Sequence, residues 1–173
     1  MNNQDPSFLD AIRMAMQAEQ KAAAFYADAA QKTTNPLGRR LLDQLAEFEH
    51  YHHTKLAELG KSLCENGACT LYEGRELLSS LPDEVEGIRE ADSMSAMGII
   101  TMAIDIKRKA KERYTALAKQ TTDPNGQAMF KRLAEEEHAN YLILNKVYWS
   151  LNNRGVWAWS TRQDTRTRQV AAL

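Results

Sequence analysis

Apolar side chains recur every three or four positions along most of the chain, the spacing with which one face of an α-helix meets a core. Capping residues divide this pattern into segments. Asn35 and Asp123 are N-cap residues, and each is followed by a proline, which suits the first position of a helix. The sequence therefore predicts four helices, over residues of about 7–32, 36–61, 93–119 and 124–151.

The chain contains an internal duplication. Residues 12–52 align without gaps with residues 100–140, and identical pairs include Tyr26/Tyr114, Pro36/Pro124, Gly38/Gly126, Leu45/Leu133, Ala46/Ala134 and Glu49/Glu137. Each copy predicts two helices joined by a short loop, which is an antiparallel hairpin. One long crossover joins the hairpins, with a short helix expected over about 72–81. Residues 1–159 are thus predicted to form an all-α four-helix bundle, and residues 160–173 a mobile tail.

Each predicted helix carries polar residues midway along the stripe that otherwise faces the core. They are Glu19 in the first helix, Glu49 and His52 in the second, Lys107 in the third, and Glu137 and Asn140 in the fourth. A buried carboxylate is costly unless it is paired with a cation or binds a metal. Three carboxylates in one layer of the bundle therefore require a cation.

The spacing of Glu49 and His52 suits metal binding, because residues three apart lie one turn apart on the same helix face. Two other pairs have this spacing, Glu47 with His50 and Glu135 with His138. The helical periodicity places those two pairs on the polar surface and favours Glu49 and His52 as the pair in the core.

At these residues the chain resembles the rubrerythrins, a branch of the ferritin-like di-iron carboxylate proteins. The matching patterns are Glu19-x-x-Ala22-x-x-Phe25-Tyr26 and Leu45-Ala46-x-x-Glu49-x-x-His52 in the first half, and Ala110-x-x-Arg113-Tyr114 and Leu133-Ala134-x-x-Glu137 in the second. The resemblance covers roughly residues 8–150. It implies a ferritin-like bundle of two duplicated hairpins, two irons between them, and a homodimer.

The resemblance also implies roles for individual residues. Glu19 and His52 take the positions of terminal ligands, and Glu49 and Glu137 those of bridging ligands. Tyr26 and Tyr114 correspond to tyrosines near the metal pair, although each also fits an ordinary core tyrosine that makes one hydrogen bond.

The second half departs from the family pattern at two ligand positions. Lys107 stands where a terminal glutamate is expected, and Asn140 where a histidine is expected. An ammonium cannot bind a metal, and an asparagine oxygen is a weak ligand. Two Cys-x-x-Cys pairs, which form the rubredoxin-type iron site of full-length rubrerythrins, are absent because the chain has two cysteines. Peroxidase activity is accordingly in doubt.

The formal charges of the side chains in this layer favour one metal ion per chain over two. Three carboxylates and the Lys107 ammonium leave two negative charges, which one divalent ion neutralises; bound protons are the alternative. The ligands suit iron best, with manganese or zinc possible. Two functions follow: an iron-dependent oxidoreductase acting on peroxide, O2 or Fe(II), or a non-catalytic scaffold or sensing protein in which Lys107 replaces metal charge.

Composition limits the partners and location. The 22 Lys and Arg residues balance 23 Asp and Glu residues, so no basic surface for nucleic acid is expected. The longest uncharged stretch, 93–104, is shorter than the roughly 20 residues of a membrane span. No secretory signal is visible, so a cytoplasmic location is expected. Cys64 and Cys69 are interpreted as free thiols rather than a redox or metal pair. The segment with Trp157 and Trp159 either folds over the bundle end or enters a dimer contact.

Overall fold

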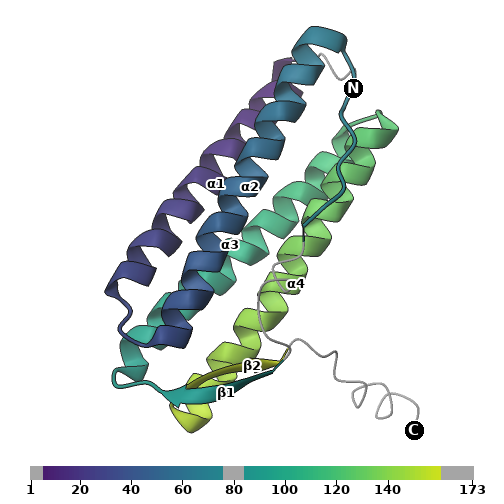
Figure 1. Ribbon diagram of the computed structural model, residues 1–173. Helices are drawn as coiled ribbons and strands as arrows, with labels where there is room; N and C mark the ends of the chain where they lie inside the picture. The colour runs from purple at the N-terminus through teal and green to yellow at the C-terminus, as the bar shows by residue number, and fades with distance from the viewer. Residues whose placement is uncertain (1–5, 76–83, 161–173) are drawn as a thin grey trace, which may run out of the picture.

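The computed structural model describes residues 6–75 and 84–160. Its elements are α1 (Pro6–Lys32), α2 (Pro36–Asn66), β1 (Glu84–Arg89), α3 (Ser93–Gln120), α4 (Pro124–Arg154) and β2 (Val156–Ser160). Helices α1 and α2 form one antiparallel hairpin, α3 and α4 form the other, and the hairpins lie side by side (Figure 1). The predicted all-α, ferritin-like four-helix bundle is confirmed.

Two helices continue beyond their predicted ends of about 61 and 151. Helix α2 extends to Asn66 because Leu63 still packs in the core, and Gly67 then ends the helix with a left-handed φ of 66°. Helix α4 extends to Arg154 in the same way, and Gly155 has a φ of 63°. In both cases the glycine that can adopt the left-handed conformation, rather than the last heptad position, decides where the helix ends.

The crossover contains a strand where only a helix was expected. Strand β1 pairs antiparallel with β2, and Ile88 lies opposite Trp157. The short helix expected over 72–81 is wrong for residues 72–75, which are not helical. The side chain of Tyr72 and the backbone N–H of Arg75 instead bond to α4, as described below. The rest of that helix and residues 161–173 of the predicted tail lie outside the described residues.

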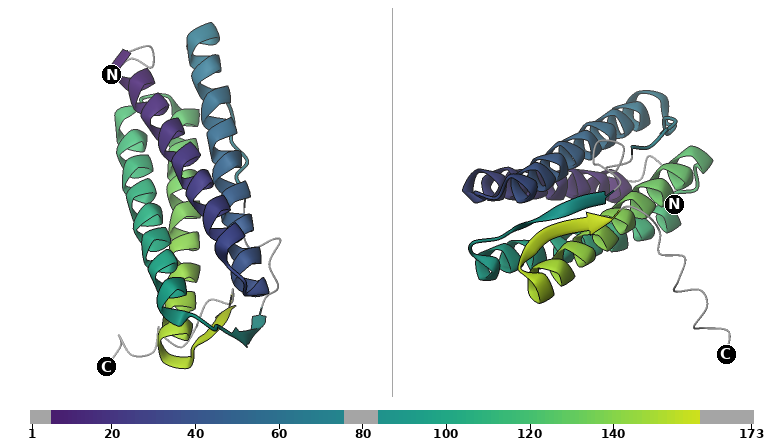
Figure 2. Two further views of the ribbon diagram at one scale, coloured as in Figure 1. Left: turned by 90° about the vertical axis from the view of Figure 1, so that its left-hand side faces the viewer. Right: turned by 60° about the horizontal axis from the view of Figure 1, so that its bottom comes forward.

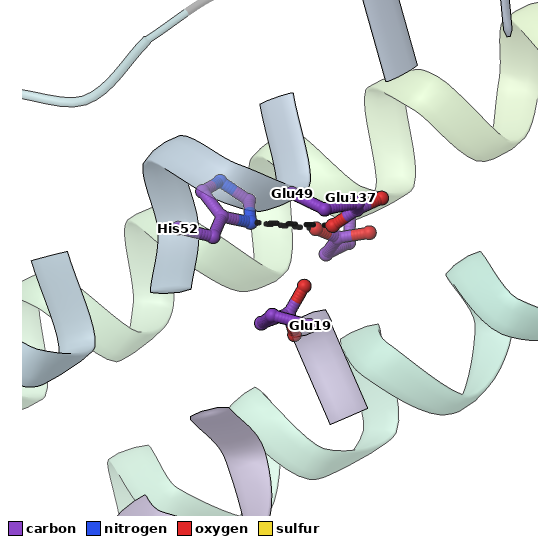
Figure 3. A group of neighbouring side chains, drawn as sticks. All are labelled: Glu19, Glu49, His52 and Glu137. Atoms are coloured by element: carbon purple, nitrogen blue, oxygen red, sulfur yellow. Dashed lines mark ion pairs between the residues drawn. The ribbon is translucent and has the colours of Figure 1, made fainter. Parts of the chain in front are cut away.

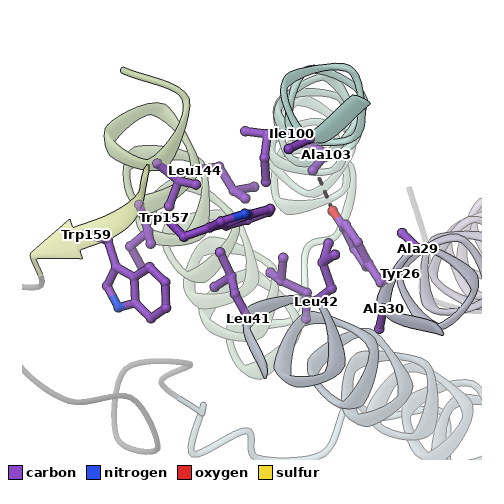
Figure 4. Close-up of a cluster of buried hydrophobic side chains, with 14 of the residues drawn as sticks. Tyr26, Ala29, Ala30, Leu41, Leu42, Ile100, Ala103, Leu144, Trp157 and Trp159 are labelled. Atoms are coloured by element: carbon purple, nitrogen blue, oxygen red, sulfur yellow. Dashed lines mark hydrogen bonds between the residues drawn. The ribbon is translucent and has the colours of Figure 1, made fainter. Parts of the chain in front are cut away.

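The β1–β2 ribbon crosses one end of the bundle, next to the loop between α1 and α2 (Figure 2). Asn35 fastens β1 to that loop, since its side-chain Nδ2 donates to the backbone oxygens of Ile88 and Arg89 at 3.3 and 3.1 Å. Trp157 of β2 is fully buried, with its ring among leucines of α2 and α4 (Figure 4). The segment after α4 therefore folds back over the bundle end.

The apolar core consists of two clusters. One lies toward the ribbon and includes Tyr26, Leu42 and Trp157; the other lies toward the opposite end and includes Tyr114 and Phe130. Between the two clusters along each helix lie the polar residues that the heptad pattern places in the core. Within the described ranges, no helix is long and apolar enough to cross a membrane.

Candidate metal centre

The polar layer brings together side chains from all four helices. Glu19 comes from α1, Glu49 and His52 from α2, Lys107 from α3 and Glu137 from α4, and each is at most 2% exposed. The three glutamates and His52 point toward one another (Figure 3). Each of these four offers one potential ligand atom, and these atoms all lie within 4.8 Å of one another.

Lys107 lies between two of the carboxylates. Its Nζ donates to Oε1 of Glu49 and lies 2.9 Å from Oε2 of Glu137. The same ammonium is 5.8 Å from the ring centre of Tyr26 and 5.3 Å from that of Phe48. Burial alone would lower the pKa of Lys107, but Glu137 and Glu49 raise it well above its ordinary value. The side chain is therefore a charged ammonium at neutral pH, and it holds three helices together.

The two ring nitrogens of His52 face three carboxylates. Its Nδ1 lies 2.9 Å from Oε1 of Glu137 and 3.9 Å from Oε2 of Glu49, and its Nε2 lies 3.0 Å from Oε2 of Glu136. Burial alone would lower the pKa of His52, but its contacts with Glu136 and Glu137 raise it to about 10. Burial would raise the pKa of Glu137, but Lys107 and His52 lower it to about 2.

The remaining carboxylates have different surroundings. Burial raises the pKa of Glu49 well above its ordinary value, although Lys107 opposes the effect. Glu19 accepts a hydrogen bond of 2.6 Å from the hydroxyl of Tyr114, and Nη1 of Arg113 lies 3.4 Å from the same oxygen. Burial, reinforced by the charge of Glu19, raises the pKa of Tyr114, so this hydroxyl stays a neutral donor.

The two tyrosines thus differ in their relation to the centre. Tyr114 contacts a candidate ligand directly, whereas the hydroxyl of Tyr26 donates to the backbone oxygen of Ala103 at 3.5 Å. Asn140 is 1% exposed, and its Nδ2 makes no hydrogen bond to the described residues. The Glu47–His50 and Glu135–His138 pairs lie outside the layer, with His138 half-buried against Lys111 and the other three exposed.

The unsatisfied atoms of the layer fit a metal ion. Within the described residues, Oε2 of Glu49 is buried without a hydrogen bond and lies 3.9 Å from Nδ1 of His52, and a buried atom without a close partner is costly. The two oxygens of Glu137 and Nδ1 of His52 also lack a hydrogen bond of good geometry, although Glu137 forms ion pairs of 2.9 Å with His52 and Lys107. Ligand atoms bound at about 2.1 Å lie at most ~4.2 Å apart across the ion. The observed 4.8 Å limit therefore requires shifts of a few tenths of an ångström to close around a cation.

One important residue was not singled out from the sequence. Glu136 precedes Glu137 and is 4% exposed, although it lies at the edge of the predicted core stripe. The sequence around Glu136 shows only that Arg132 lies four positions earlier, and a charged pair at this spacing indicates an ordinary helix surface. Glu136 is buried because the crossover packs over it, and this contact depends on tertiary structure.

The two cysteines take no part in the centre. Both are free; Cys64 is exposed, and Cys69 is buried beside Asp123 and Gly126. Burial raises the pKa of the Cys69 thiol to about 11, so it stays protonated and unreactive at neutral pH.

Comparison with known proteins supports the resemblance of the first half. The rubrerythrin family model matches residues 3–60, which include Glu19, Glu49 and His52. The first hairpin is rubrerythrin-like. A solved structure of a hypothetical protein from Pyrococcus furiosus is 25% identical, with a TM-score of 0.66 over 86% of this chain and 92% of the other. No curated protein matched. The rubrerythrin match and the buried Glu/His group together indicate a divalent-metal site.

Proposed function

We propose that the protein binds one divalent metal ion, with Glu19, Glu49, His52 and Glu137 as ligands and Lys107 in place of a second ion. The strongest support is the division of two carboxylates. Glu49 and Glu137 each direct one oxygen to Lys107 and the other toward Nδ1 of His52. A cation on the His52 side would take the second oxygens, while the ammonium keeps the first.

The charges of the layer agree with one ion. With His52 neutral as a ligand, Glu19, Glu49 and Glu137 together with Lys107 carry two negative charges, which one divalent ion neutralises. Without an ion, an imidazolium at His52 and a proton on Glu49 have the same effect, as their raised pKa values favour. Metal binding is therefore an exchange of one divalent cation for two protons.

The ligand set favours iron. Three carboxylates and one imidazole form a hard, oxygen-rich site that suits Fe(II) or Mn(II) and also accepts Zn(II). We propose an iron-dependent oxidoreductase acting on peroxide, O2 or Fe(II), in which the bound iron would supply one electron at a time. Tyr114 holds Glu19 in place, and the Lys107 ammonium stabilises negative charge in the layer. A two-electron substrate therefore requires an external electron donor.

A second candidate is a non-catalytic scaffold. The observation that favours it is the position of Lys107, which joins α3 to α2 through Glu49 and to α4 through Glu137. In this case the ion pairs would stabilise the bundle, and any bound metal would add stability alone.

Metal analysis of protein purified without chelator separates these proposals. One ion per chain supports the single-metal site, two ions contradict it, and none favours the scaffold. Iron-loaded protein that consumes peroxide with a supplied reductant supports the oxidoreductase. Iron-loaded protein that only gains thermal stability contradicts it.

A matched pair of variants locates the metal. His52→Asn removes the candidate ligand, whereas His50→Asn makes the same change in the exposed Glu47–His50 pair. Metal content should be lost in the first and unchanged in the second. Equal metal content in both folded variants would place the ion elsewhere.

We also propose the homodimer that the resemblance implies. Light scattering after gel filtration should give twice the mass of 19.6 kDa, and a value near that of one chain would contradict it.

A further inference from the structure

The buried carboxylate of Glu136 is surrounded by hydrogen-bond donors. Its Oε2 lies 3.0 Å from Nε2 of His52 and accepts from the hydroxyl of Tyr72 at 2.7 Å. Its Oε1 accepts from the backbone N–H of Arg75 at 2.8 Å and from Nε of Arg132 at 3.1 Å. Tyr72 and Arg75 belong to the crossover, so this carboxylate joins the crossover to the centre.

Both ring nitrogens of His52 face a carboxylate, Nδ1 that of Glu137 and Nε2 that of Glu136. When a cation binds at Nδ1, that nitrogen must give up its proton, and the proton that remains on the neutral ring is then on Nε2, where Glu136 accepts it. Nδ1 is the nitrogen that faces Glu137 at 2.9 Å and Glu49 at 3.9 Å. Glu136 therefore stabilises the form of His52 whose free nitrogen points into the carboxylate cluster.

Both oxygens of Glu136 are needed as acceptors. Each accepts from two groups, and the N–H of Arg75 and Nε of Arg132 can only donate. A glutamine must therefore either lose the contacts to Arg75 and Arg132 or turn its NH2 group toward His52 and Tyr72, where Nε2 can accept only if the proton of the neutral imidazole moves to Nδ1.

We propose that Glu136 is a positioning residue for the metal centre, and that the crossover, through Tyr72 and Arg75, sets the metal affinity without contacting the ion. This inference rests on the proposed metal binding, with His52 as a ligand. It assigns to the crossover a functional role in addition to joining the hairpins.

The test compares Glu136→Gln with Glu135→Gln, a matched change at the adjacent side chain, which is 69% exposed. Titration of metal-free protein with Zn(II) should show a dissociation constant about 10- to 100-fold larger in Glu136→Gln, the usual effect of losing such a partner. Glu135→Gln should bind as wild type. A folded Glu136→Gln variant with wild-type affinity overturns the proposal.

A spectroscopic readout separates positioning from stability. In long-range 1H–15N spectra of the zinc-bound protein, His52 should carry its proton on Nε2, and in Glu136→Gln this proton should lose its hydrogen-bonded chemical shift and exchange faster with water. If Glu136→Gln does not fold, Tyr72→Phe decides, because it removes one donor at a half-buried side chain. Its affinity for Zn(II) should fall by less than that of Glu136→Gln, and unchanged affinity overturns the proposal.

Failure of the proposed function has a different signature. If wild-type protein binds no metal, the metal proposal fails on its own, and the metal-free spectra test Glu136. Because the metal-free His52 is an imidazolium with a proton on each nitrogen, the readout is the exchange of its Nε2–H with water. Faster exchange in Glu136→Gln then supports positioning of the ring by Glu136, and unchanged exchange overturns it.

Discussion

At the scale of single residues, we expect Lys107 and Asn140 to decide how many metal ions the bundle can hold. Lys107 forms ion pairs with one oxygen of Glu49 and one of Glu137. A second ion would need these same oxygens as ligands. Lys107→Glu combined with Asn140→His replaces the ammonium by a carboxylate and adds an imidazole. We predict two ions per chain in this variant by metal analysis.

The same variant should depend on metal for its stability. Without metal, its polar layer holds the carboxylates of Glu19, Glu49, Glu137 and the new glutamate with no ammonium between them, and breaking a buried pair costs about 3–5 kcal/mol. Its melting temperature should therefore drop sharply on adding chelator, more than that of wild type. Asn140→His alone keeps Lys107 and should still bind one ion. A folded double variant with one ion per chain would contradict this account of Lys107.

The sequence predicts the layer of the centre well and its surroundings less well. Glu19, Glu49, His52, Lys107 and Glu137 each lie midway along the buried stripe of their own helix, and the duplicated antiparallel hairpins bring these midpoints to one level. The role of Glu136 was missed, because what distinguishes it from an exposed glutamate is the crossover packed over it. Such a contact depends on how distant segments meet, which periodicity does not encode.

At the scale of elements, the two long helices of the duplication begin with equivalent caps that have diverged. Asn35 accepts from the N–H groups of Leu37 and Gly38 through Oδ1, and its Nδ2 donates to carbonyl oxygens of β1. Asp123 accepts in the same way at the start of α4, but its Oδ2 accepts from the N–H of Cys69. Each cap therefore also fastens one end of the crossover.

Giving either cap the residue of the other, as Asn35→Asp or as Asp123→Asn, should destabilise the protein. Asn35→Asp places an oxygen against the carbonyls of Ile88 and Arg89, and Asp123→Asn either places an NH2 group against the N–H of Cys69 or gives up the helix cap. Leaving such a group unsatisfied costs about 1–3 kcal/mol. Urea unfolding at neutral pH measures this loss. Either variant matching wild type would show that the second contact contributes nothing.

Acid distinguishes the two caps. Burial alone would raise the pKa of Asp123, but bonds from the N–H groups of Cys69, Gly126 and Asn125 lower it below its ordinary value of 3.8. Its stabilising effect is therefore complete above about pH 4 and is lost as the pH falls through the lowered pKa. The stability difference between wild type and Asp123→Asn should shrink in acid, whereas asparagine at position 35 does not titrate.

The strands were not predicted because little in their own sequences requires them. A two-stranded ribbon is marginally stable by itself. Here β2 is held by Trp157, which packs in the core, and β1 is held by Asn35. The helices, in contrast, carry periodic patterns and caps that are local, and these fix their number and order. Even so, two helix ends were placed too early.

At the scale of the whole molecule, few contacts join the two hairpins directly, and they lie mainly between α1 and α3. The backbones are far apart elsewhere, and side chains join the hairpins instead, in the two apolar clusters and in the polar layer at mid-bundle. Trp157 packs with Leu41 of α2 and Leu144 of α4 in one cluster (Figure 4). At the ribbon end of the bundle, the spacing of the hairpins therefore depends on how this ring packs.

The Trp157 ring can pack in this position because residue 38 is a glycine. A Cβ at position 38 would lie 2.6 Å from two ring atoms of Trp157 and 2.9 Å from Cγ2 of Thr33. Gly38→Ala should therefore destabilise the protein by about 1–3 kcal/mol through overpacking. Gly98→Ala, with no neighbouring atom within 4 Å of the new Cβ in the described structure, should stabilise it by about 0.5–1 kcal/mol. Thermal melts distinguish them, at roughly 2–4 °C per kcal/mol for a chain of this size.

A third variant shows whether the ring causes the loss. In a Trp157→Phe background the smaller ring leaves room near position 38, so Gly38→Ala should cost less there than in wild type, and the two effects should not add. Additive losses would mean that Thr33, rather than Trp157, resists the new methyl group. If Gly38→Ala is as stable as Gly98→Ala, the tryptophan is not seated tightly, and the hairpin spacing is set by the polar layer instead.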